Sequence, residues 1–270
     1  MSSYFKAEYS ARLPWPLAQL YPRAHNEKSA HAQHGVIFNL FEVFVRLPAC
    51  ALIAAYLAEV EKDPQVAKPD LDAALASLHK PSFGAWNGLL RDFARHYGEE
   101  SKTVPALGHL WPQLTRQRKD LPAVLELYRN IKNGIHGQPA GSQSVSVRQL
   151  LDTLVEYRNA VIGHGSTQPE KFYSGRMCPR LFPALNELLG DGTLDLLGPS
   201  GTRLLYVDEI RIKSRGTAAL EVRELTGSHG LRQEISIGSR HVDALESGTV
   251  AVLWPGQESP LPLNPLARFL

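Results

Sequence analysis

The spacing of hydrophobic residues changes once along this chain, near residue 200. Before that point they recur every three or four positions, which indicates amphipathic helices. From residue 202 onward they alternate with polar residues or cluster as β-branched residues in short runs, which indicates antiparallel strands. Helices and strands that follow one another in separate blocks are typical of an α+β fold, so we expect an all-α part followed by a β-rich part.

A glycine-rich stretch, 191–201, separates the two patterns and predicts a domain boundary. We therefore expect a helical domain over residues 1–197 and a small antiparallel β-rich domain over residues 202–270. Its four or five short strands, separated by turn residues, favour a barrel- or sandwich-like arrangement.

The most apolar segment spans residues 30–60 and predicts a long buried helix. Pro48 lies inside it and is expected to kink or divide the helix, because proline lacks the backbone N–H and clashes with the preceding turn. Asn39, Glu42 and Arg46 interrupt the apolar run, which argues against a membrane span.

Two further helices have clear start signals. Ser82 is a candidate N-cap for a helix over 83–97, and Ser144 or Ser146 for a helix over 147–163. The first helix carries an apolar face made of Phe83, Trp86, Leu89, Leu90 and Phe93. In the second, an apolar stripe runs to Ile162, and position 158, an arginine, falls within it by the same spacing.

Composition excludes several classes of protein. Lys and Arg number 29 against 27 for Asp and Glu, so no overall positive charge suggests nucleic-acid binding. The two cysteines lack metal-ligand spacing, and the amino-terminal residues lack a signal-peptide pattern, so we expect a cytoplasmic protein without a structural metal. The cluster His25, His31 and His34 has no supporting carboxylate or cysteine, and a solvated or interface face is the favoured reading.

An arginine in an apolar stripe requires a compensating partner, because a buried charge must be paired, hydrated or placed at a cleft. Asn159 follows Arg158 directly, and His164 follows Gly163, a residue typical of helix ends. The helix dipole favours a protonated imidazole at such an end. The pattern therefore predicts that Arg158, Asn159 and His164 converge at one end of a helix.

The run RNAVIGHG resembles the signature of HEPN domains, in which an arginine, usually followed by a polar residue such as asparagine, is separated from a histidine by four to six intervening residues. Five residues intervene here. The segments NLFEVFVRLPACALIAAYL and PSFGAWNGLLRDFARHY are similar to the first and middle helices of bacterial HEPN-like regions next to kinases and defence modules. The resemblance covers about residues 25–190 and implies a helical bundle that commonly forms a homodimer with facing motifs.

The family also implies roles for the three residues. Arg158 would contact the scissile phosphate of RNA and stabilise negative charge, a role that a guanidinium performs well. His164 would be the general acid or base, and Asn159 would orient one of the two. The resemblance thus implies a metal-independent endoribonuclease or toxin-like effector in bacterial antiviral defence or stress response, with no cofactor.

Two alternatives remain open at this point. Arg158 and His164 could have a purely structural role at the end of a buried helix, with Glu42 as the expected ion-pair partner. Alternatively, the chain could be a non-catalytic HEPN-like interaction or sensor module that docks a partner protein, a fused signalling domain or a nucleotide through its β tail.

Overall fold

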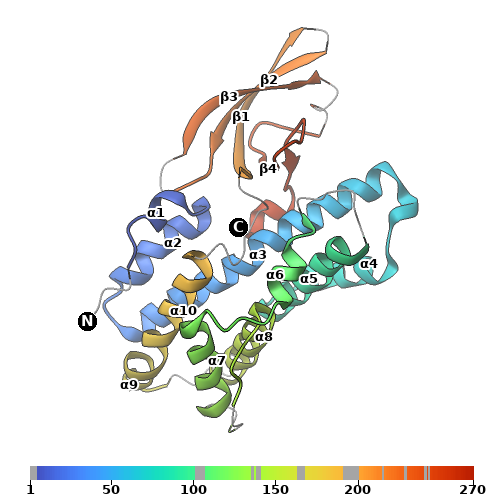
Figure 1. Ribbon diagram of the computed structural model, residues 1–270. Helices are drawn as coiled ribbons and strands as arrows, with labels where there is room; N and C mark the ends of the chain where they lie inside the picture. Colours follow the sequence, from blue (N-terminus) through green and yellow to red (C-terminus); the bar gives the residue numbers. More distant parts are fainter. Residues whose placement is uncertain are drawn as a thin grey trace.

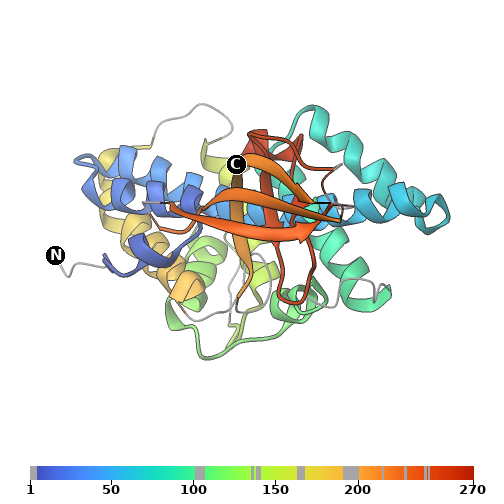
Figure 2. The ribbon, with the colours of Figure 1, turned by 90° about the horizontal axis from the view of Figure 1, so that it is seen from above.

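The computed structural model describes residues 5–100, 107–134, 137, 141–162, 168–190, 201–214, 216–227, 230–239, 242 and 244–270. The fold is α+β, as predicted: a helical part comes first, and a five-stranded antiparallel sheet follows. The sheet stands on one side of the helical part, as Figure 1 shows, and it lies over the middle of the molecule when seen from above (Figure 2).

The centre of the helical part is α3, an unbroken helix over Ala30–Lys62. Ser29 caps its first turn by accepting a hydrogen bond from the Ala32 N–H. Pro48 lies within this helix and does not divide it, because α2 (Trp15–Asn26), α5 (Phe83–Arg95) and α10 (Cys178–Gly190) pack against α3 and hold it as one element. The division expected at Pro48 is therefore wrong.

Within the described part of the chain, α3 is the single helix with the length and apolar character of a membrane span. However, 83% of its most apolar stretch is buried inside the fold. This burial is what a core helix requires, and the polar interruptions in the sequence agree with it.

The remaining helices surround α3 and are mostly short. They are α1 (Tyr9–Arg12), α4 (Pro69–Leu75), α6 (Leu110–Thr115), α7 (Pro122–Gly134), α8 (Val147–Tyr157) and α9 (Glu170–Phe172). The start signal at Ser82 is confirmed, because its hydroxyl accepts a hydrogen bond from the Ala85 N–H at the start of α5. All five residues of the apolar face predicted for this helix are buried.

The strands are β1 (Arg203–Ser214), β2 (Thr217–Glu224), β3 (Leu231–Gly238), β4 (Val250–Leu253) and β5 (Leu261–Pro262). They form one antiparallel sheet in the order β3-β2-β1-β4-β5. The barrel- or sandwich-like arrangement expected from the sequence is therefore not found: β3 and β5 lie at opposite edges, and no second sheet occurs among the described residues. Alternation alone predicted the strands but not whether the sheet closes on itself.

The base of the sheet shares the helical core. Leu204, Val252 and Trp254 belong to the same buried cluster as α3 and α5, whereas Leu205, Val207 and Leu220 belong to a second cluster within the sheet. The last turn, Leu266–Phe269, returns to the helices, where the rings of Phe269 and Trp86 meet edge to face at 5.2 Å. The domain boundary proposed near residue 200 stays a prediction.

Candidate functional site

The segment that carries the motif begins with a well-defined cap. The Ser146 hydroxyl accepts a hydrogen bond from the Gln149 N–H, and the Gln149 side chain accepts one from the Ser146 N–H. This reciprocal arrangement is a capping box, and it fixes α8 to begin at Val147. Of the two serines considered from the sequence, Ser146 is therefore the cap.

At its other end, α8 passes into a π-helical turn over Arg158–Ile162. The residue that points fully into the core here is Tyr157, and Val161 is also buried. The Arg158 side chain keeps 33% of its surface exposed. The apolar stripe therefore runs through Tyr157, and Arg158 lies at the edge of the stripe rather than within the core as the spacing predicted.

The partner of Arg158 is the residue suggested from the sequence. Its Nε lies 3.8 Å from Oε1 of Glu42 on α3. The Glu42 side chain is 24% exposed, so the ion pair sits at a boundary between core and solvent. Partial exposure reduces both the desolvation penalty and the Coulombic gain of such a pair.

A second arginine binds the same carboxylate. Nη2 of Arg46, one turn along α3, lies 3.4 Å from Oε2 of Glu42. Its Nη1 donates a hydrogen bond of 2.9 Å to the carbonyl oxygen of Phe269. Two guanidinium groups thus share one carboxylate, which leaves one positive charge in excess at a partly exposed point.

Behind this cluster lies a buried polar pair. Nε2 of His34 and the hydroxyl of Tyr157 are 2.6 Å apart, and both side chains are almost fully buried. Burial, with a smaller contribution from the charge of His31, lowers the pKa of His34 to about 4, and burial raises the pKa of Tyr157. Both groups are therefore neutral near pH 7, and their hydrogen bond fastens the end of α8 to α3.

The sequence reasoning missed this role of His34. His25 and His31 are exposed, in agreement with the expected solvated face, but His34 is buried, and for it that interpretation is wrong. The available signal was the spacing of four residues along α3 from His34 through Phe38 and Glu42 to Arg46. That spacing places one side chain per turn on a single helix face, here the face that meets the end of α8.

Of the other two predicted site residues, the structure describes Asn159 but not His164. Asn159 is exposed beside Arg158. His164 lies outside the described residues, as do Gly163 and His136. The structure therefore brings Arg158 together with Glu42, and the expected convergence of Arg158 with His164 stays a prediction. Where the chain is described, no group of three His, Cys, Asp or Glu residues is placed to hold a metal ion.

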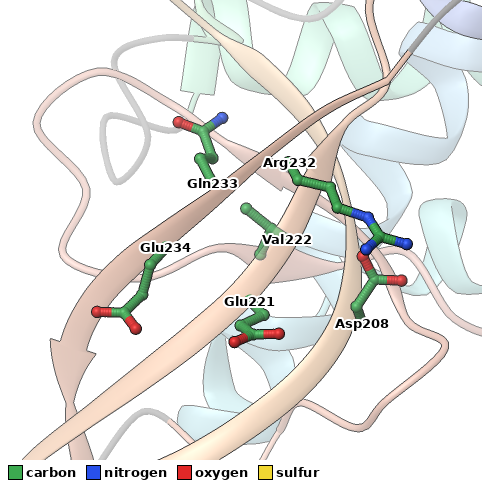
Figure 3. A pocket seen from close by; sticks show the side chains of 6 residues that line it. All are labelled: Asp208, Glu221, Val222, Arg232, Gln233 and Glu234. Atoms are coloured by element: carbon green, nitrogen blue, oxygen red, sulfur yellow. The ribbon is translucent and has the colours of Figure 1, made fainter.

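A separate hollow of about 390 Å³ lies on the sheet, far along the chain from Arg158 (Figure 3). Three carboxylates line it, and each is bound by a cation of another strand: Asp208 by Arg223, Glu221 by Arg211 and Glu234 by Lys213. Val222, Arg232 and Gln233 complete the lining, so the hollow carries charges of both signs. This mixed lining identifies no single class of ligand.

Comparisons with family models, with curated proteins and with solved structures each found no match to this chain.

Proposed function

We propose that this chain is a HEPN-type endoribonuclease that acts as a homodimer in the cytoplasm, independently of metal ions. The observation that carries the proposal is the sharing of Glu42 by Arg158 and Arg46, which concentrates positive charge at a partly exposed surface. Guanidinium groups bind phosphate oxygens in paired hydrogen bonds, so this point suits the backbone of RNA.

The proposed reaction assigns each residue one task. An RNA phosphate replaces Glu42 as the partner of Arg158, whose guanidinium then stabilises the negative charge that develops on the phosphate. His164 acts as the general acid or base on the ribose 2′-hydroxyl or the leaving oxygen, and the exposed Asn159 orients one of these groups. The cellular role that follows is that of a toxin-like effector in antiviral defence or stress response.

Incubation of the purified protein with mixed RNA in EDTA tests this function. Cleavage is expected for the wild type and is lost in Arg158→Ala and His164→Ala, whereas Arg148→Ala keeps it. Arg148 is the matched control because it is an exposed arginine of the same helix, bound to Asp152 and not to Glu42. Circular dichroism and melting curves establish that all variants fold. Cleavage at the wild-type rate by Arg158→Ala contradicts the proposal.

A second function is favoured by the same ion pair. Glu42 already neutralises Arg158, which accounts for this arginine without catalysis. In that case the chain is a non-catalytic HEPN-like interaction module, and its sheet docks a partner protein. Mass measurement in solution with and without RNA separates the two functions. A composite site of two motifs requires a dimer that binds RNA. A folded protein that neither binds nor cleaves RNA supports the interaction module.

A further inference from the structure

Strand β3 forms an edge of the sheet whose outer side has no neighbouring strand among the described residues. Its residues Arg232, Glu234 and Ser236 are exposed, and Leu231 keeps 73% of its surface accessible. An edge of this kind presents backbone N–H and C=O groups that can pair with another strand.

A hydrogen bond just beyond the ends of β2 and β3 identifies which backbone groups of β3 face away from the sheet. Ser239 N–H donates to the Gly216 carbonyl, in register with the pairing of β2 and β3. In an antiparallel ladder the bonded residues alternate, so Ile237, Ile235, Gln233 and Leu231 direct their backbone groups to β2. Arg232, Glu234 and Ser236 then direct theirs to the open side.

The pairing of β1 with β2 leads independently to the same result. Leu225 N–H donates to the Leu204 carbonyl, so alternate residues of β2, including Arg223, bond to β1. Val222 and Glu224 therefore bond to β3, where their partners are Gln233 and Leu231. The two ladders agree on the outward residues of β3.

The charged residues of β3 are complementary to those of a second, antiparallel copy of the same strand. Arg232 and Glu234 are two positions apart, so their side chains lie on the same face of the sheet. Glu234 is bound by Lys213. The guanidinium of Arg232 points toward Asp208, which Arg223 binds (Figure 3), and Arg232 forms no ion pair or hydrogen bond of its own among the described residues. An antiparallel copy of β3 centred on Gln233 places Glu234 of the second copy opposite Arg232, and Arg232 of the second copy opposite Glu234.

We infer that β3 pairs with β3 of a second copy of this chain, antiparallel and about a two-fold axis at Gln233, to make one continuous sheet across the dimer. The pairs of Arg232 with Glu234 fall at outward-facing positions on both strands, where each pair exchanges two backbone hydrogen bonds. Leu231 then lies opposite Ile235 on the other face, which covers the most exposed large apolar side chain of the described residues. Such an isologous contact closes after two subunits.

This inference does not depend on ribonuclease activity, because the edge lies on the sheet and none of its residues belongs to the cluster around Glu42. It commits to a second copy rather than to another protein, because the same short strand supplies both members of each charge pair. Glu234 of the second copy is thus the partner of Arg232, and no other protein is needed.

Light scattering or sedimentation over a range of protein concentrations tests the dimer. The wild type is expected to dimerise, and Arg232→Glu and Glu234→Arg are each expected to raise the dissociation constant about tenfold or more, because two pairs per dimer change from attraction to repulsion. The double variant R232E/E234R recovers dimerisation, since opposite charges face each other again. Lys80→Glu, an exposed charge reversal away from the sheet, leaves the dimer unchanged.

A single cysteine tests the register. Gln233→Cys is expected to form a disulfide between two copies under mild oxidation, because paired residues at the axis have Cα atoms about 4.5 Å apart at a non-hydrogen-bonded position. Ser236→Cys, equally on the edge but opposite residue 230 of the other copy, forms none. A folded wild type that stays monomeric at all concentrations, a dimer insensitive to both single charge reversals, or equal cross-linking at 233 and 236 overturns the inference.

Discussion

Nε of Arg158 lies 3.8 Å from Oε1 of Glu42, across the contact between the end of α8 and the middle of α3. A double-mutant cycle with Glu42→Gln and Arg158→Gln measures the coupling of this pair. Because both side chains are partly solvated, we expect a coupling energy of about 0.5 kcal/mol in urea denaturation.

The matched control is the same cycle with Arg148→Gln, an arginine of α8 that binds Asp152 instead. Its coupling to Glu42 is expected to vanish, because the two residues share no contact. Equal coupling of Glu42 to both arginines contradicts a specific pair and indicates a general charge effect.

The buried His34 makes stability depend on pH. Its pKa is lowered from 6.5 to about 4 by burial, so between these values the unfolded chain binds a proton that the folded chain does not. The contribution of His34 to the free energy of unfolding is therefore fully present above pH 6.5 and is lost as the pH falls toward 4. The loss between pH 7 and pH 5 amounts to about 2 kcal/mol.

Denaturation curves of wild type and His34→Gln at pH 7 and pH 5 measure this contribution. The variant is less stable at pH 7, but its stability changes less between the two pH values. His31→Gln alters an exposed histidine one turn away and is expected to change the pH dependence only slightly, because burial is the larger cause of the lowered pKa of His34. If His34→Gln and wild type show the same slope, His34 is not buried in its neutral form.

The capping box at the start of α8 predicts a stability difference between two serines. Ser146→Ala removes the acceptor for the Gln149 N–H and is expected to lower the free energy of unfolding by about 1 kcal/mol. Ser144→Ala removes only a side-chain hydrogen bond to Gln117 and is expected to change it by less than about 0.5 kcal/mol. Thermal or urea unfolding compares the two, and the reverse order would place the cap at Ser144.

Local patterns predicted the elements of this fold better than their arrangement. The strand segments and the helix after Ser82 follow from spacing and capping residues, which act over a few positions. The open sheet does not follow from alternation, because closure depends on which strands meet at the edges. Likewise, Pro48 is accommodated within α3 by the tertiary packing around that helix.

The site was predictable to a similar extent. An arginine within an apolar stripe requires a counter-charge, and the acid within the other apolar helix, Glu42, was the natural candidate. Spacing alone did not separate Tyr157 from Arg158, since both fit a helical face, and it was Tyr157 that entered the core. The spacing of four residues from His34 to Glu42 indicated a shared helix face, but the partner of His34, Tyr157, is distant in sequence and could not be identified from that spacing.

The most direct test of the proposed ribonuclease is product analysis with a defined RNA oligonucleotide and its all-DNA counterpart, both in EDTA. We expect the dimeric wild type to cut the RNA, to leave the DNA intact and to produce 2′,3′-cyclic phosphate ends, because the ribose 2′-hydroxyl is the nucleophile. Arg158→Ala and His164→Ala should each slow cleavage by about a hundredfold or more, and Arg148→Ala should not. Intact RNA after incubation with folded, dimeric wild-type protein, or equal cleavage by the Arg158→Ala variant, would contradict the proposed ribonuclease function.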